Sequence, residues 1–209
     1  MTTGSQIAAR VAALCLNDSG ELALGAYPAM AIRAALLVDL GQEGRLTQTA
    51  AEIEIDTTPI GSPPADQALA ELASLDGHSL EWWLDRSRIG LTDLAEAEVA
   101  TGDWLRTREA RWHRAPRYAV GATTRRDRDV DMLTKSLAPQ TAGDVAVLGI
   151  AVAAGIADAR TAPPGDTLLS RTGDVRWLCE RVGDHLREAR ITGNAVGRAT
   201  WSAMIASRP

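Results

Sequence analysis

The fold is decided by the stretch GAYPAMAIRAALLVDLGQEGRL, residues 25–46. From Ala29 to Leu40 it is apolar on nearly every side, apart from two charged residues. A helix that is hydrophobic all round is packed by other elements on most of its faces, so the stretch predicts a central buried helix. Pro28 suits the first turn of that helix, and Gly41 lies where it should end.

Arg33 is the anomaly in this helix, because guanidinium groups are rarely buried without a partner. Its helical neighbours, three and four residues away, are all apolar, so the helix supplies no carboxylate: Ala29, Met30, Leu36 and Leu37. Arg33 must therefore form a structural ion pair with another element, extend its head to the surface, or meet an anionic ligand. The sequence leaves all three readings open.

The composition is that of an ordinary soluble globular protein, with 45% hydrophobic and 23% charged residues. A chain of 209 residues forms one domain, or at most two, and can bury a real core. Aromatic residues make up only 4% and Phe is absent, so the core must be built from aliphatic side chains and alanine, which favours helices. The net charge of −5 gives no whole-chain reason to expect nucleic-acid or membrane binding.

No segment has the features of a targeting signal or a membrane span. The start, MTTGSQIAAR, lacks the basic-then-apolar layout of a signal peptide, and the longest apolar run, Val145 to Ala157, is 13 residues. We therefore expect a cytoplasmic protein whose membrane contact, if any, is peripheral. Cys15 and Cys179 lie in apolar helical patterns and are interpreted as small buried side chains, neither a disulfide nor a metal pair.

The hydrophobic periodicity predicts a mainly α fold: a compact helical domain around buried central helices, with one or two small β-hairpins. Besides the central helix, helices are expected at residues 5–16, 62–75, 80–88, 91–101, 124–137, 145–157, 174–189 and 192–206. One hairpin is expected from residues 44–49 and 51–57, and a second from residues 104–106 and 110–114.

Catalytic chemistry has little support in the sequence. His78, His113 and His185 are isolated from one another, and no metal-binding spacing, phosphate-binding loop or nucleophile motif occurs. Carboxylates such as Glu96 and Glu98 are interpreted as parts of solvated helix faces. We therefore expect no enzyme activity, no metal and no cofactor.

The segment from Trp104 to Arg126 carries the strongest local charge. It holds one acid, Glu109, and seven arginines, at positions 106, 108, 111, 114, 117, 125 and 126. Trp112 and Tyr118 are interleaved with this charge. Arginines and aromatic rings suit an anionic lipid surface, and they also suit nucleic acid. An ordinary basic face whose tryptophans pack inward is equally consistent with the pattern.

The pair Trp82-Trp83 is a second aromatic feature. Neighbouring residues on a helix point about 100° apart, so at most one of the two rings can face the core fully. The other ring covers the end of the core, lines a cleft, or contacts Arg86.

Four collinear stretches resemble the Golgi phosphoprotein 3 family in its actinobacterial form. They are LCLNDSGEL leading into AIRAALLVDLGQEGRL, DTTPIGSPPADQAL, the helix ending at Gly102 with its Arg-rich hairpin, and VAVLGIAVAAGIAD followed by WSAMIAS. The resemblance implies a single mainly helical domain over residues 1–209, without enzyme activity. It also implies an adaptor that binds phosphatidylinositol 4-phosphate, or another anionic phospholipid headgroup, at the membrane periphery.

In the eukaryotic relatives, a tryptophan and three arginines hold the headgroup and a neighbouring hydrophobic hairpin enters the bilayer. By position, two of those arginines correspond to Arg33 and Arg88, while the tryptophan and the third arginine are replaced by Leu24 and Leu91. Arg86 is a candidate source of replacement charge. The membrane hairpin corresponds to residues 104–114, with Trp104, Arg106, Arg108, Arg111, Trp112 and Arg114 as its candidate contacts.

Two other functions remain open at this stage. One is a protein-interaction scaffold without lipid binding, whose basic hairpin meets an acidic partner, such as the cytoplasmic tail of a membrane protein. The other is a nucleic-acid-binding regulator. The helix before Gly102, LTDLAEAEVAT, is acidic where a recognition helix should be basic or polar, so nucleic acid is not expected. The oligomeric state is left open.

Overall fold

The protein is described by a computed structural model. It covers residues 6–23, 26–49, 52–75, 77–109, 116–121, 126–135, 138–156 and 172–206, with side chains of the last range described up to residue 193. Across these ranges, no helix combines the length and the apolar character needed to cross a membrane.

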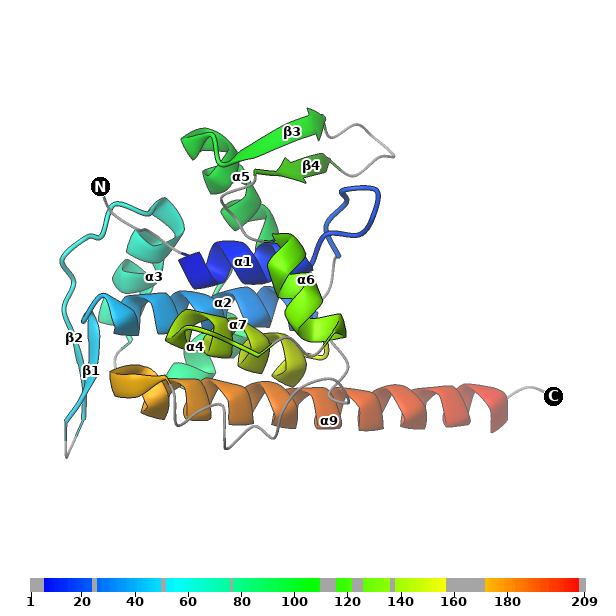
Figure 1. Ribbon diagram of the computed structural model, residues 1–209. Coiled ribbons are helices and arrows are strands. Elements are labelled where there is room, and N and C mark those ends of the chain that lie inside the picture. The colour runs from blue at the N-terminus through cyan, green and yellow to red at the C-terminus, as the bar shows by residue number, and fades with distance from the viewer. Residues whose placement is uncertain are drawn as a thin grey trace.

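The predicted central helix is confirmed as α2 (Ala26–Gln42), which runs through the middle of the molecule (Figure 1). From Met30 to Leu40, every residue except Arg33 is buried. α2 packs against α1 (Gln6–Leu14), α7 (Ala142–Ala153) and α9 (Arg176–Ala206). The mainly α fold class is therefore confirmed.

α9 runs antiparallel to α2. Gly41, near the end of α2, lies against Leu178, whereas Tyr27, at its start, lies against Gly193. The sequence predicted two helices here, 174–189 and 192–206, and that prediction is wrong because α9 is continuous through Gly193. A glycine inside a helix costs only about 1 kcal/mol. At position 193 a Cβ would overlap the Tyr27 hydroxyl, so glycine is what allows the two helices to pack this closely.

Shorter helices surround this core: α3 (Pro63–Ala73), α4 (Leu80–Arg86), α5 (Leu91–Thr101), α6 (Arg126–Thr134) and the 3-10 turn η3 (Gly173–Val175). The Ser79 hydroxyl caps α4 by accepting from the Trp82 amide at 3.2 Å, as its position before the apolar run predicts. α5 ends at Gly102, which adopts the left-handed conformation (φ 83°) that favours glycine.

Each of the two small sheets is an antiparallel hairpin. β1 (Leu46–Gln48) pairs with β2 (Ile53–Ile55), which confirms the first predicted hairpin. β3 (Trp104–Arg108) pairs with β4 (Arg117–Val120). The second strand was expected at residues 110–114, which lie outside the described residues; the described partner of β3 is β4. The Tyr118 amide also donates to the Gly20 carbonyl at 2.8 Å, so β4 is fastened to the turn after α1.

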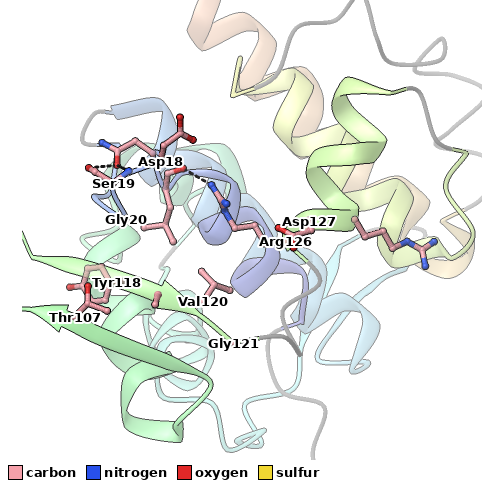
Figure 2. Close-up of a pocket in the computed structure, with 13 residues that line it drawn as sticks. Asp18, Ser19, Gly20, Thr107, Tyr118, Val120, Gly121, Arg126 and Asp127 are labelled. Carbon is pink, nitrogen blue, oxygen red and sulfur yellow. Dashed lines mark hydrogen bonds between the residues drawn. The ribbon is translucent and has the colours of Figure 1, made fainter.

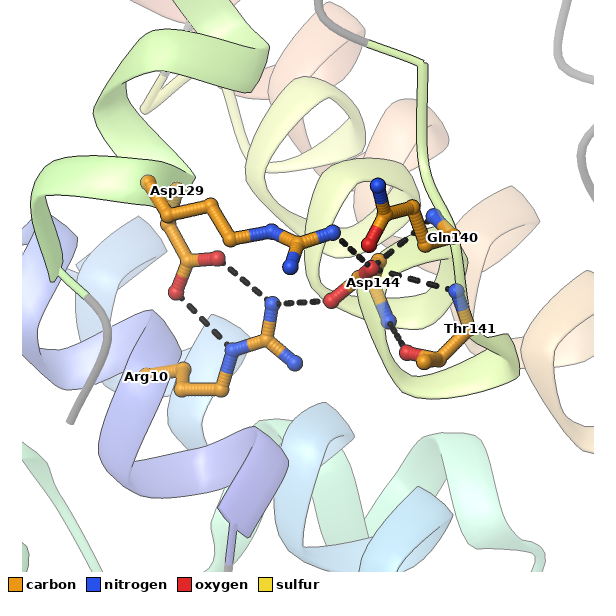
Figure 3. Close-up of polar contacts among 6 residues, drawn as sticks. Arg10, Asp129, Gln140, Thr141 and Asp144 are labelled. Carbon is orange, nitrogen blue, oxygen red and sulfur yellow. Dashed lines mark hydrogen bonds and ion pairs between the residues drawn. The ribbon is translucent and has the colours of Figure 1, made fainter. Parts of the chain in front are cut away.

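A buried polar cluster joins α1, α6 and α7 (Figure 3). The Arg10 guanidinium donates to both carboxylate oxygens of Asp129, at 2.9 and 2.5 Å, and to Asp144 at 2.7 Å. Both carboxylates are fully buried, and Arg128 approaches Asp144 at 3.0 Å. Burial by itself raises the pKa of Asp144, but hydrogen bonds from the Gln140 amide and from Arg10 hold that pKa below its ordinary value.

Candidate functional site

α4 presents three distinct faces. Its inner face is buried and consists of Leu80, Trp83 and Leu84. A second face pairs with α9: Arg181 forms a two-pronged ion pair with Glu81, and the His185 ring lies 2.9 Å from Asp85. The third face carries Trp82 and Arg86, which are both exposed. The sequence prediction that only one ring of the Trp82-Trp83 pair can face the core is therefore confirmed.

The loop between α4 and α5, residues 87–90, is anchored to α3 by hydrogen bonds. Glu71 accepts from the Ser87 hydroxyl at 2.6 Å and from the Trp83 indole at 2.9 Å. At the other end of the loop, the Gly90 amide donates to Asp93 at 2.8 Å. Since these bonds fix both ends, the loop is a defined platform, and we call it the α4–α5 loop.

Arg33 reaches the α4–α5 loop from α2. Its Nε donates to the Ile89 carbonyl at 2.8 Å, and one terminal nitrogen donates to the Leu84 carbonyl at 2.6 Å. Carbonyls at the end of a helix lack intrahelical partners and carry partial negative charge, so Arg33 acts as a C-terminal cap of α4. No carboxylate forms an ion pair with it in the described part of the chain.

The electrostatics of Arg33 follow from this position. Burial lowers the pKa of its guanidinium, partly offset by the more distant carboxylates Glu71 and Asp85. Arginine is not deprotonated in proteins, so the group is a half-buried cation that is held by two carbonyl dipoles and forms no ion pair with a described carboxylate. Of the three readings left open by the sequence, the internal ion pair is excluded among the described residues.

The structure brings the other predicted ligand residues to the same loop. Arg88 lies on it and Arg86 ends α4 beside it; both are exposed, and neither has an ion pair with any described residue. Leu91, which replaces a family arginine, is buried at the start of α5. Leu24, which replaces the family tryptophan, lies outside the described residues.

The hairpin tryptophan departs from expectation. Trp104 is 1% exposed and packs edge-on against Tyr118, with ring centroids 6.1 Å apart. The expectation that its ring lies at a membrane surface is therefore wrong in this structure, because the first residue of β3 points into the core. The next residue, Leu105, points outward and is 68% exposed.

The hairpin arginines are largely neutralised by nearby acids. Arg106 forms ion pairs with Glu96 and Glu109, and Arg108 and Arg117 both reach Glu21, at 2.5 and 3.1 Å. The Arg108 hydrogen bond, followed by that of Arg117, lowers the pKa of Glu21. The basic run read from the sequence is thus not a free cationic surface in its described part. The remaining hairpin candidates, Arg111, Trp112 and Arg114, lie outside the described residues.

The carboxylates of α5 were interpreted as solvated, and the structure corrects this. Glu96 accepts from the Tyr118 hydroxyl at 2.7 Å. Glu98 is half-buried, and burial, followed by repulsion from Asp103 and Asp39, raises its pKa to about 7. Tyr118 and Asp39 are invisible in a local sequence pattern because they come from β4 and α2, whereas Asp103 lies only five residues beyond Glu98.

A cavity of about 440 Å³ lies elsewhere, between the turn after α1, the β3–β4 hairpin and the start of α6 (Figure 2). Arg126 lines it, but its guanidinium donates to the carbonyls of Ala13 and Leu16, both at 3.0 Å, and so closes the end of α1. None of the predicted headgroup ligands lines this cavity.

Little in the described residues suggests bond-making chemistry. They contain no group of three or more His, Cys, Asp or Glu side chains placed to hold a metal ion. Burial raises the pKa of the Cys15 thiol to about 12 and that of Cys179 to about 11, so both thiols are unreactive. The α4–α5 loop, with its cations, is suited to binding an anion.

The model of the family Golgi phosphoprotein 3 (GPP34) matches residues 7–197. A search of curated proteins found no match. The family match covers most of the chain, from α1 into the second half of α9. The protein therefore belongs to the Golgi phosphoprotein 3 family.

Proposed function

We propose that the protein binds an anionic phospholipid headgroup, of the phosphatidylinositol 4-phosphate type, at the α4–α5 loop. In this proposal it is a peripheral adaptor on the cytoplasmic face of a membrane, without catalysis. Arg33 and Arg88 contact the phosphate and Arg86 adds charge beside them. The observation that carries the proposal is the half-buried Arg33, which is bound by two carbonyls and paired with no described carboxylate.

The geometry around Arg33 supports anion binding in two ways. Its second terminal nitrogen makes no hydrogen bond with any described residue, so that nitrogen can donate to a phosphate oxygen. Arg88 is exposed on the loop whose Ile89 carbonyl holds Arg33, so a second cation is available there.

The replacements at Leu24 and Leu91 bear on the strength of binding. With two of the four family ligand positions apolar, the headgroup is held chiefly by charge and by the rigid loop. We therefore expect modest, reversible binding that falls as salt is added. We also expect other anionic headgroups to compete.

The hairpin contributes differently in this proposal. Its described arginines are paired with acids, so its bilayer contact rests on exposed Leu105. α5 has 11 residues and is therefore about 16 Å long, which separates the hairpin from the α4–α5 loop by a distance that one membrane surface can span.

Vesicle flotation tests the proposal. Wild type should float with phosphatidylcholine vesicles that contain phosphatidylinositol 4-phosphate and stay behind with phosphatidylcholine alone. Arg88→Ala should bind about fivefold more weakly, since one arginine at an anionic surface is worth about 1 kcal/mol. The matched control is Arg176→Ala, an exposed arginine of α9 that is paired with Glu180. Equal flotation of wild type with both vesicle types would overturn the proposal.

A further inference from the structure

The outer face of α4 carries an exposed aromatic ring next to two arginines that form no ion pair with a described residue. Trp82 is 40% exposed and is one of three large hydrophobic side chains exposed in the described part of the chain. Arg86 lies one helical turn further along the same face. Arg88 follows on the α4–α5 loop, so ring and cations lie within a few residues of one another.

The rest of α4 explains why this face stays uncovered. Its inner face is in the core, and its second face is held by the Arg181–Glu81 ion pair and by the contact of the His185 ring with Asp85. Trp82 has one ring partner: the His78 ring stacks on it with centroids 4.0 Å apart and planes inclined by 8°. His78 is itself exposed, so the stack does not draw the indole into the core.

We propose that Trp82 anchors the protein in the interfacial layer of the bilayer whose headgroup binds at the α4–α5 loop. This inference rests on the proposed function. Trp82 enters the layer at headgroup level, while Arg86 and Arg88 lie against the lipid phosphates.

A lipid bilayer is assigned as the partner because its surface complements the exposed face of α4 in both charge and polarity. A surface that satisfies this face must be anionic for the arginines and must also accept an indole ring at the same depth. Tryptophan rings favour the membrane–water interface, where their apolar body and polar N–H are both accommodated. Arginines beside such a ring are attracted to anionic lipid within a Debye length of the surface.

Two ligands distinguish binding of the headgroup from binding of the bilayer. Wild type and Trp82→Ala are compared for binding to vesicles containing phosphatidylinositol 4-phosphate and to water-soluble inositol 1,4-bisphosphate. Trp82→Ala should lose about tenfold in vesicle affinity, equivalent to about 1.4 kcal/mol. It should bind the soluble phosphate as wild type does. His78→Ala, which breaks the same stack but keeps the indole, is the matched control and should retain vesicle affinity.

Each remaining outcome counts against the inference. Equal vesicle affinity of Trp82→Ala and wild type would overturn it and leave the proposed function standing. An equal loss toward both ligands would place Trp82 in the headgroup pocket instead of the bilayer. Wild type that binds neither ligand would remove the proposed function and this inference together.

A second readout does not depend on affinity. Vesicles made with brominated acyl chains quench tryptophan fluorescence at the interface, so they should quench wild type more than Trp82→Phe. Equal quenching of the two proteins would show that the indole stays in water.

Discussion

Two arginines reach into the core of this protein, and they are balanced in opposite ways. Arg10 is enclosed by the carboxylates of Asp129 and Asp144, which have no exposed surface (Figure 3). Arg33 lies at the end of α4, where the carbonyls of Leu84 and Ile89 are its acceptors among the described residues. The first charge is paired with buried carboxylates, whereas the second is held by carbonyl dipoles with two carboxylates only at longer range.

This difference separates the structural role of Arg10 from the binding role that we propose for Arg33. A compensated ion pair has no charge left for a ligand, and its effect is to fasten α1, α6 and α7 together. A cation held by carbonyls is fixed in position and still attracts an anion. The contrast can be tested by substitutions that change stability, binding, or both.

The largest expected effect comes from breaking the Arg10 cluster. Asp129→Ala leaves the Arg10 guanidinium buried with only part of its partners, and breaking a buried pair of this kind costs about 3–5 kcal/mol. The free energy of unfolding should fall by that amount in a urea titration. Asp184→Ala, which removes an exposed carboxylate paired with Arg187, is the matched control and should change it by less than about 0.5 kcal/mol. If Asp129→Ala lowered the free energy of unfolding no more than the control does, the buried cluster would stabilise the protein no more than an exposed ion pair.

Glu98 extends the comparison to a charge without an opposite partner. Burial and two like charges raise the pKa of its carboxyl from 4.5 to about 7. Between these values the folded state binds a proton that the unfolded state has lost, so stability falls as pH rises through this window.

Glu98→Gln should therefore remove part of the pH dependence of stability. The variant should gain on the order of 2 kcal/mol relative to wild type at about pH 8, and close to nothing below the ordinary glutamate pKa. Unfolding titrations at both pH values measure this difference. An advantage that is larger at acidic pH would contradict the raised pKa.

Arg33 should affect stability and binding together, whereas Arg88 should affect binding alone. Arg33→Ala leaves two carbonyls without their donor, at a cost of roughly 1–2 kcal/mol. Arg88→Ala breaks no contact with a described residue and should leave the melting temperature unchanged. Thermal unfolding and vesicle flotation of both variants measure the two effects. If Arg33→Ala were as stable as wild type, the cap on α4 would be unimportant.

The smallest effect is expected at the hairpin. Glu21→Gln removes the acid that Arg108 and Arg117 share, so the net positive charge of the described part of the hairpin rises. Affinity for anionic vesicles should then rise roughly two- to fivefold at low salt and return toward wild type as salt screens the charge. A fall in affinity would mean that the ion pairs hold the hairpin in its binding shape.

The sequence predicted the elements of the fold well, because each leaves a local pattern. The central helix and the Ser79 cap could be read directly from apolar runs and capping residues. The continuous α9 could not, because Gly193 looks like a helix breaker until Tyr27 is known to pack against it.

The candidate site was predictable only in part. Arg33 could be singled out as a buried cation lacking a local partner, but its acceptors lie more than 50 positions away, at Leu84 and Ile89. The pairing of the hairpin arginines with Glu21 and Glu96 was equally invisible, since charge counted along a segment ignores acids contributed by other elements. Long-range partners are therefore the part of this site that required the structure.

The two polar contacts between α4 and α9 have a consequence for biosynthesis. Glu81 contacts Arg181 and Asp85 contacts His185, and each partner lies 100 residues downstream. Because a ribosome delivers α9 after α4, α4 and the loop that follows it lack this support until α9 has emerged. A nascent chain halted before residue 181 should therefore bind anionic vesicles more weakly than a chain that includes α9.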